Sequence, residues 1–526
     1  MLPTFMLVAL VAAPTFGAVV NYNFVVNNVK AAPDGFERSV VAVNGLIPGT
    51  LIKANKGDTL RVNVTNQLTD STMRRATTIH WHGLFQSSTA GEDGPAFVTQ
   101  CPISQFNSYT YEIPLHDQTG TFWYHSHLSS QYVDGLRGGL IIYDPNDPQK
   151  HLYDVDDEST VITLNDWYHT PAPTLQEQFF STDNTALNAP VPDSALINGR
   201  GRYVGGPEVQ RSVLKVTPGK RYRFRDDYYR SYYEIVPTNK HLTSLQEADG
   251  IAHEPLVVDS FDIYAGQRYS VIVEANQTVA NYWVRAPMTV AAAGTNANLD
   301  ASDVFAVLRY DGAPNAEPTT EQGTALGVTP LVEENLHALI NPGAPGGSAP
   351  ADVQVNLTIG RSTIDGSVAF TFNGVQYKPP SLPTLLQILA NNATTDADFG
   401  TSEHTLTLPF NKTIELVITG GANHPIHLHG HVFDVVQSLG GSINYVNPPR
   451  RDVVRVSSTG VILRFRTDNP GPWFVHCHID WHLEAGLAVV FAEAPSEIRS
   501  GRQHVTTNPS WNQLCPKYQA LSADLQ

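Results

Sequence analysis

The chain has 526 residues, of which 16% are charged and 41% are hydrophobic, and it contains 39 Gly and 36 Pro. This length allows about three domains, and the many Gly and Pro residues favour short strands joined by turns over long helices. The formal net charge of −17 argues against nucleic acid as a partner, because nucleic-acid binding needs basic patches.

An apolar segment, MLPTFMLVALVAAPTFGA, opens the chain. It is too short to span a bilayer and ends in small residues of the kind a signal peptidase reads. We therefore expect residues 1–17 to be a secretory signal peptide, with a buried N-terminal strand as the alternative. No later segment has the roughly 18 uninterrupted apolar residues of a membrane span, so we expect a secreted monomer that enters no membrane. The sequons that are candidate glycosylation sites are Asn63, Asn276, Asn356, Asn392 and Asn411.

One sequence pattern occurs three times along the rest of the chain. Each copy has Asn-Gly, a spacer and an alternating strand, and the copies begin in segments 43–64, 197–225 and 372–377. Each copy is followed by an aromatic strand: GTFWYHSH (120–127), NYWVRA (281–286) and GPWFVHCH (471–478). Strand-like runs bounded by Gly and Pro, repeated in the same order, predict an all-β fold of three consecutive Greek-key β-sandwich domains.

Two polar segments with Pro or Gly, 143–151 and 311–323, look like linkers between these domains. The expected boundaries are 18–147 for the first domain, 148–316 for the second and 317–526 for the third. The clearest helical segment is SLPTLLQILANN, residues 381–392, which lies before the final strands.

Ten of the 19 histidines fall in four short clusters. The clusters are HWH (His80, His82), HSH (His125, His127), HPIHLH (His424, His427, His429) and HCHIDWH (His476, Cys477, His478, His482). Residues i and i+2 of a strand point to the same face, so each H-x-H presents two imidazoles together. Two pairs in the first third of the chain and two in the last predict a polynuclear metal site between the first and third domains.

Cys477 should point away from His476, onto the face where it would meet His424 and His482. Two imidazoles and a thiolate are the trigonal set of a blue-copper electron-transfer site. The plain alternative is a buried free cysteine. A zinc site would favour closed tetrahedral ligation and would leave the other histidines unexplained.

The chain has two further cysteines, Cys101 and Cys515. In an oxidising compartment an odd count implies one disulfide and one thiol with another role. Since Cys477 lies in the histidine cluster, we expect a Cys101–Cys515 bridge, which stabilises by up to about 5 kcal/mol in the chain-entropy model.

The segments HWHG, DGPAFVTQCPI, GTFWYHSH, HPIHLHGH and HCHIDWHLEAGL resemble the multicopper oxidases, most closely the fungal laccases. This resemblance covers nearly the whole mature chain, and it implies cupredoxin-like domains and four copper ions. It assigns a type 1 copper to His424, Cys477 and His482, and a type 2 copper to His80 and His427. It assigns the two type 3 coppers to His82, His125 and His478, and to His127, His429 and His476.

The resemblance also implies laccase activity, in which four one-electron oxidations of phenols or aromatic amines are coupled to the reduction of O2 to two waters. Electrons would enter at the exposed edge of His482 and pass through Cys477 to His476 and His478. A metal-ion oxidase of the same family, acting on Fe(II) or Mn(II), is the alternative enzyme. It would need carboxylates near His482, and the sequence shows no dedicated cluster there.

Three further residues match family positions near the coppers. Asp93 and Asp480 match the acids near the three-copper cluster, although a turn aspartate and a surface charge are the plain readings. Leu487 occupies the axial position, which many relatives fill with Met. Because Leu cannot coordinate, we expect a raised type 1 potential.

The chain departs from the family in two places. Val133 stands where these laccases have a cysteine that bridges the first two domains. Segment 226–241 reads DDYYRSYYEIVPTNKH, with Asp226 and Asp227 at positions that should be apolar, and Tyr232 near the position of the acid that orients phenols. A diverged or re-engineered loop and a short shifted reading frame are both open, and a catalytically impaired copper protein is a second alternative. Burying two aspartates would cost several kcal/mol unless the strand bulges outward.

Overall fold

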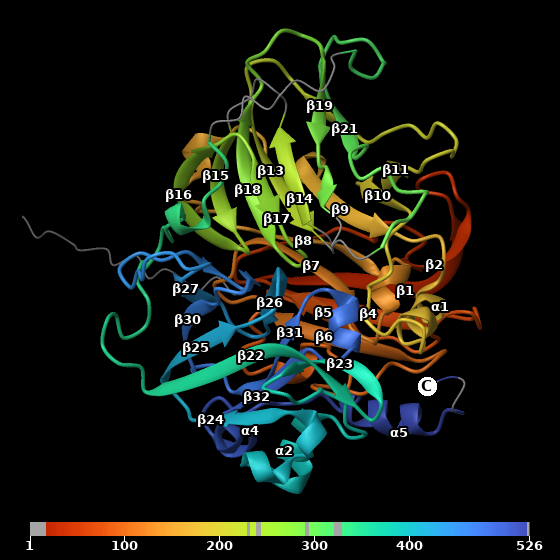
Figure 1. Ribbon diagram of the computed structural model, residues 1–526. Coiled ribbons are helices and arrows are strands. Elements are labelled where there is room, and N and C mark those ends of the chain that lie inside the picture. The colour runs from red at the N-terminus through yellow and green to blue at the C-terminus, as the bar shows by residue number, and fades with distance from the viewer. Residues whose placement is uncertain are drawn as a thin grey trace, which may run out of the picture.

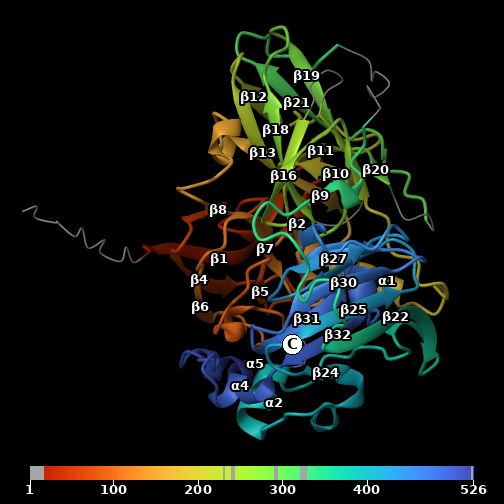
Figure 2. The same cartoon turned by 90° about the vertical axis from the view of Figure 1, so that its left-hand side faces the viewer.

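The structure, a computed structural model, describes residues 17–228, 232–237, 243–289, 294–319, 329–522 and 525, with backbone alone where it describes 227–243. The expected signal peptide therefore lies almost wholly outside the described residues, as do the side chains of Asp227 and Tyr232. In the described part the strands form six sheets, two in each third of the chain. The middle third stands on the other two (Figures 1 and 2). The all-β prediction is confirmed.

The first third has two four-stranded sheets. One has the order β2 (Arg38–Val43), β1 (Val19–Ala31), β4 (Thr59–Gln67) and β6 (Ser108–Pro114). The other has the order β3 (Ile52–Asn55), β8 (Arg137–Tyr143), β7 (Gly120–Ser126) and β5 (Ile79–His82). Burial alternates along β4, as expected for a strand with one solvated face, whereas β5 and β7 are buried on both faces.

The second third has one seven-stranded sheet and one of six strands. The first has the order β11 (Arg200–Arg202), β10 (Ser194–Ile197), β9 (Val161–Trp167), β13 (Arg221–Tyr228), β18 (Arg268–Glu274), β15 (Thr243–Ala248) and β16 (Ile251–Val258). The second has the order β12 (Val213–Val216), β21 (Phe305–Tyr310), β19 (Asn281–Arg285), β14 (Tyr232–Pro237) and β17 (Phe261–Ile263), with β20 (Met288–Thr289) paired to β14.

The last third has sheets of six and five strands. The first has the order β23 (Ser367–Phe372), β22 (Val353–Ile364), β25 (Thr413–Thr419), β30 (Val461–Arg466), β27 (Phe433–Gln437) and β28 (Arg450–Arg451). The second has the order β24 (Thr405–Leu408), β32 (Ala488–Glu493), β31 (Gly471–Cys477), β26 (His424–Leu428) and β29 (Val453–Val456).

The sheets repeat one topology, which agrees with the threefold sequence pattern. Each third has one parallel pair in each sheet, namely β1/β4 and β3/β8, then β9/β13 and β12/β21, then β22/β25 and β24/β32. By this correspondence β5, β14 and β26 are equivalent strands, and so are β7, β19 and β31. The three predicted aromatic strands are therefore the same strand of three repeats.

Five α-helices lie in the described part: α1 (Ala172–Phe179), α2 (Thr384–Asn391), α3 (Asp480–Glu484), α4 (Pro495–Ser500) and α5 (Leu514–Gln519). The predicted helix at 381–392 is confirmed as α2, which begins after Pro383 and ends at a left-handed Asn392. The other four were not predicted. None of the helices in the described residues has the length and apolar character needed to cross a membrane.

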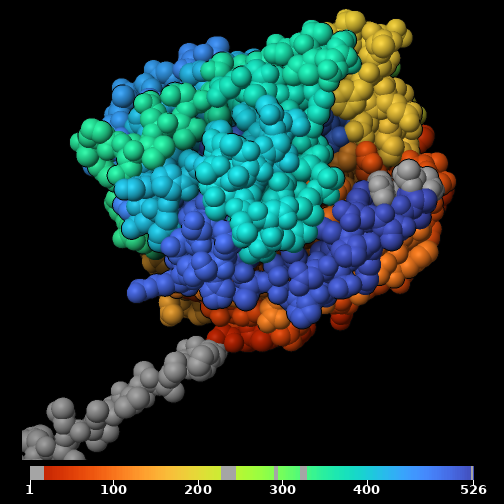
Figure 3. All heavy atoms as spheres, turned by 90° about the horizontal axis from the view of Figure 1, so that it is seen from below, coloured from red at the N-terminus to blue at the C-terminus, as the bar shows by residue number. Residues whose placement is uncertain are grey.

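The end of the chain is tied to its first third. Helix α5 and the segment before it lie against the first third in the view from below (Figure 3). The predicted Cys101–Cys515 disulfide is present and joins residues 414 positions apart, while Cys477 is a free, buried cysteine. Val133, at the position of the missing family cysteine, is buried in the core instead.

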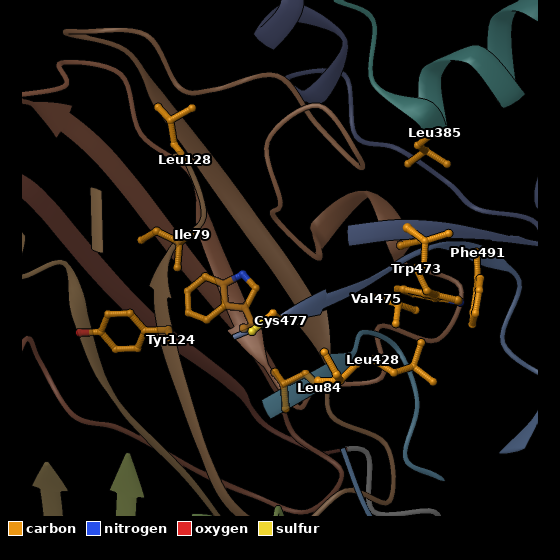
Figure 4. Close-up of a cluster of buried hydrophobic side chains, with 14 of the residues drawn as sticks. Ile79, Leu84, Tyr124, Leu128, Leu385, Leu428, Trp473, Val475, Cys477 and Phe491 are labelled. Carbon is orange, nitrogen blue, oxygen red and sulfur yellow. The ribbon is translucent and has the colours of Figure 1, made fainter. Parts of the chain in front are cut away.

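The two outer thirds share one hydrophobic core. Ile79 and Tyr124 of the first third belong to the same buried cluster as Leu428, Trp473 and Cys477 of the last (Figure 4). The second third has a separate cluster of its own. A site between the outer thirds is therefore held by continuous packing, which gives its side chains fixed positions.

Strand β13 stays in its sheet through Asp226. The backbone of Asp226 pairs with Tyr269 and Ile162, so the strand does not bulge outward here. Tyr222 and Phe224 face the hydrophobic cluster of the second third, and the period of two places Asp226 on the same face. Its side chain is 1% exposed, and its Oδ1 has no hydrogen-bond partner among the described residues.

Candidate metal centre

Strand periodicity places the clustered histidines. In β5, Trp81 belongs to the hydrophobic core, so His80 and His82 share the opposite face. In β31, Cys477 belongs to the core, so His476 faces the other way, toward the first third. The predicted opposite orientation of these two neighbours is what the structure has. The equivalent strands of the second third, β14 and β19, carry no histidine.

Eight buried histidines of the outer thirds form one cluster: His80, His82, His125, His127, His427, His429, His476 and His478. Their ring nitrogens approach one another closely. The Nε2 atom of His476 lies 3.1 Å from that of His429 and 3.4 Å from that of His127, and Nε2 of His478 lies 3.1 Å from Nδ1 of His82. The predicted pairing of the two outer thirds across one site is therefore present in the geometry.

Within the cluster, three sets of histidines bring ring nitrogens within 4.8 Å of one another. They are His127, His429 and His476; His80, His82 and His125; and His80, His427 and His429. The first set equals one expected type 3 group. The other expected type 3 group shares His82 and His125 with the second set.

Burial keeps seven of the eight histidines neutral. Burial, followed by the charges of neighbouring groups, lowers well below the usual value the pKa of His82, His125, His127, His427, His429 and His478. Burial also lowers the pKa of His476 to about 3. Neutral imidazoles keep a lone pair that a metal can accept.

Hydrogen bonds fix how the rings face. Asp93 contacts two of the rings. Nδ1 of His80 lies 2.8 Å from the carbonyl oxygen of Asp93, and Nδ1 of His429 lies 2.9 Å from the carboxylate of Asp93. Nδ1 of His427 lies 2.9 Å from the carbonyl oxygen of Asp452. In each ring Nε2 is thereby left for the centre of the cluster, and Nε2 of His80 and His427 has no partner among the described residues. This is the support typical of metal-binding histidines.

An ion pair that joins all three thirds lies behind the cluster. Arg268 of β18 donates two hydrogen bonds of 2.7 Å to Asp452 and one of 3.1 Å to the carbonyl oxygen of Thr121. The carboxylate of Asp452 lies 3.3 Å from Nε2 of His82 and 3.6 Å from Nδ1 of His427. The second third therefore contributes to the site through its positioning charge, although it provides no histidine.

A second, smaller site lies on the core face of β31. The Sγ atom of Cys477 lies 3.6 Å from Nδ1 of His424 and 3.5 Å from Nδ1 of His482, and these two nitrogens are 3.1 Å apart. Burial raises the pKa of the thiol, and the charge of Asp480 raises it further. Leu487 is fully buried, and its carbonyl oxygen accepts a hydrogen bond from the backbone of Cys477.

His482 is the half-exposed member of this smaller site. It lies on α3, which follows β31 directly, so the turn of the helix brings it back beside Cys477. The ring of Phe370 lies 4.4 Å from that of His482. Burial lowers the pKa of the neighbouring His424 to about 4, with a second contribution from the charge of Arg361.

Sequence reasoning missed Asp452, Arg268 and Phe370. Their positions depend on contacts between strands far apart in the chain, for which the sequence gives no periodic signal. Asp480, which was predicted, is buried in the first turn of α3. Four of the five sequons are exposed, and Asn63 is half-buried.

Three family models described as multicopper oxidase match residues 25–147, 158–313 and 377–497. Laccase-4 of Thanatephorus cucumeris is 71% identical over 92% of this chain and 91% of its own length. The chain belongs to the multicopper oxidase family. Laccase-2 of Agaricus bisporus is 49% identical over 99% of both chains. These relatives support laccase activity, the oxidation of phenols coupled to the reduction of O2.

Solved structures of multicopper oxidases share the three-domain cupredoxin-like fold. A laccase from Botrytis aclada is 31% identical, covers 96% of this chain and 93% of its own, and has a TM-score of 0.81. Fet3p, a multicopper oxidase that functions in iron import, is 27% identical, covers 97% and 98%, and has a TM-score of 0.84.

The donor set of the site fits copper. Imidazole nitrogens suit copper, and two imidazoles with one thiolate form the trigonal set that blue-copper sites use. The buried Nε2 atoms of His80, His125 and His427 have no hydrogen-bond partner in the part of the chain that the structure describes, which would be costly unless a cation satisfies them. The residues present therefore fit copper, the metal that the family implies.

Proposed function

We propose that this multicopper oxidase holds four coppers and uses them to oxidise small phenols and aromatic amines with O2. The observation that carries the proposal is the convergence of eight histidines beside a separate Cys477 site on the opposite face of one strand. The type 1 ligands would be His424, Cys477 and His482, and the type 2 ligands His80 and His427. The type 3 ligands would be His82, His125 and His478 for one ion, and His127, His429 and His476 for the other.

Copper bound in these sites would supply one-electron transfer and the reduction of O2. The chain supplies the connection, because His476 and His478 flank Cys477 and belong to the other site. The half-exposed ring of His482 is where a phenol can approach. Asp93 bridges His80 and His429, and we propose that it and Asp480 deliver the protons that O2 reduction consumes.

Further properties belong to the same proposal. Domain boundaries at 147 and 316 are part of it, and the first two family-model matches, which end at 147 and 313, support them. Secretion after removal of residues 1–17, glycosylation at the five sequons and a monomeric state agree with an extracellular laccase. The mass of the secreted protein before and after removal of N-linked glycans tests the first two properties, and light scattering tests the third.

Metal analysis and oxygen uptake test the function. Copper-loaded protein should contain four coppers per chain and should consume one O2 for every four molecules of a methoxyphenol oxidised. With Fe(II) as the donor, uptake should be much slower, because Glu484, two residues from His482, is half-buried and its carboxylate accepts a hydrogen bond from Ser129. Faster uptake with Fe(II) would point to a metal-ion oxidase instead.

We expect Leu487→Met to lower the reduction potential of the Cys477 site. Leu487 is fully buried next to this site, and a Met thioether there can act as a weak axial ligand that favours the oxidised ion. A redox titration followed by the visible absorption of the copper-loaded protein measures this. An unchanged or higher potential in the variant would contradict the axial assignment. Leu487→Ile, which adds no donor, is the control.

A further inference from the structure

We propose that Arg361 makes this site select phenols that carry a carboxylate, an inference that rests on the proposed function. Arg361 is exposed and lies on β22, directly opposite Phe370 of β23 in the antiparallel register. Its guanidinium carbon lies 4.6 Å from the centre of the Phe370 ring. A positive charge therefore lies close to His482, the residue that a phenol would approach. The protein as a whole has a net charge of −17.

Stacking fixes the guanidinium near His482. The Phe370 ring also contacts two of the proposed ligands, His482 at 4.4 Å and His424 at 5.7 Å between ring centres. The distance from the guanidinium carbon to the centre of the His482 ring therefore cannot exceed the sum of the guanidinium–Phe370 and Phe370–His482 distances. A phenol whose hydroxyl points to His482 can place a substituent on the opposite side of its ring near Arg361. Cation–π stacking also holds the plane of the guanidinium, which reduces the entropy lost on binding.

The guanidinium of Arg361 has more N–H donors than its hydrogen bond to the protein requires. One N–H of Arg361 donates a hydrogen bond of 2.9 Å to the carbonyl oxygen of Ala186, in the loop after α1. This contact joins the second and last thirds beside the site. A guanidinium has five N–H donors, and carboxylates accept them in pairs. A carboxylate on the substrate can therefore be bound without breaking the contact to Ala186.

No carboxylate of the described residues forms an ion pair with Arg361. The acid on its own hairpin, Asp365, lies 3.2 Å from Lys378 instead. An arginine whose charge is uncompensated and whose plane is fixed is suited to bind an anionic group, whereas a neutral phenol gains nothing from it.

The test compares two substrates that differ by one charge, 4-hydroxy-3-methoxybenzoate and its amide, in four copper-loaded proteins. These are the wild type, Arg361→Gln, Arg361→Lys, and the matched control Arg499→Gln, which removes one exposed arginine from α4. The quantity of interest is kcat/KM for the carboxylate divided by kcat/KM for the amide. This ratio cancels differences in copper loading, and comparing it between the four proteins cancels the difference in reactivity of the two phenols.

We expect Arg361→Gln to lower this ratio about three- to tenfold, through KM for the carboxylate, while kcat/KM for the amide stays constant. Arg361→Lys should keep part of the preference, and Arg499→Gln should keep all of it. The preference should weaken at high salt. An unchanged ratio in Arg361→Gln, or an equal fall in Arg499→Gln, would overturn the inference.

Binding provides a readout that needs no turnover. Calorimetric titration with 3,4-dimethoxybenzoate and its amide, which lack the phenol, should show weaker binding of the carboxylate alone in Arg361→Gln. If the wild type oxidised neither phenol, the proposed function would fail, and this titration would still decide whether Arg361 binds carboxylates. Equal binding of the carboxylate by wild type and variant would overturn the inference.

Discussion

Cys477→Ser should abolish the intense visible absorption of the copper-loaded protein and reduce its oxidase activity below detection. The thiolate is the source of that charge-transfer band, and a serine hydroxyl replaces it poorly as a ligand. Residues that merely support a ligand cost roughly 10–100-fold when removed, so the loss of a ligand should exceed this. Visible spectroscopy and oxygen uptake with a methoxyphenol measure both effects.

The loss should be confined to the smaller site. Metal analysis of Cys477→Ser should give three coppers per chain, since the eight-histidine cluster does not include the thiol. Circular dichroism should be unchanged. Ser130→Ala, a buried change elsewhere, should keep the band and serves as the control. A blue band that persisted without the thiol would refute the assignment of Cys477.

Asp226→Asn should stabilise the protein by several kcal/mol at pH 8 and by little near pH 4. Burial raises the pKa of Asp226 from 3.8 to about 8. The folded chain therefore holds a proton that the unfolded chain releases, and stability falls as pH rises through this interval. Each unit of difference between the folded and unfolded pKa values changes the free energy of unfolding by about 1.4 kcal/mol once the carboxyl is ionised. The amide cannot ionise, so the pH-dependent loss disappears. Asp226→Leu should stabilise further because it fits the apolar cluster.

Thermal and denaturant midpoints between pH 4 and pH 8 check this expectation. Asp117→Asn is the control, since the side chain of Asp117 is 98% exposed and should leave the pH profile unchanged. If Asp226→Asn had the same pH profile as the wild type, the carboxyl would have to reach solvent or a partner in the folded protein. The proposed copper ligands lie outside this strand, so the visible spectrum of the copper-loaded protein should be identical in all these variants.

The period of two explains how much of the site could be predicted. His80 and His82 lie within β5, where alternation assigns faces directly. His482 lies on α3, where alternation assigns no face. Its predicted place beside Cys477 depended on the donor set that a blue-copper site needs and on the resemblance to a family. The threefold repeat could be predicted as well, because each copy keeps its own Asn-Gly turn and aromatic strand.

Contacts between the thirds could not be predicted. The pairing of Arg268 with Asp452 depends on how the second third docks on the last, which no local pattern encodes. The stacking of Arg361 on Phe370 depends on the register of one hairpin. Asp226 could be recognised as out of place, but whether its strand would bulge or stay in the sheet depended on the packing of its neighbours.

The division of the histidines between the two ends of the chain limits when copper can be acquired. His82 and His478, whose nitrogens lie 3.1 Å apart, are separated by 396 positions. A ribosome has made most of the polypeptide before the second partner exists, so neither site can be filled during synthesis. Metal insertion must follow translation, and any truncation that removes the last strands leaves a chain that cannot be metallated at either site.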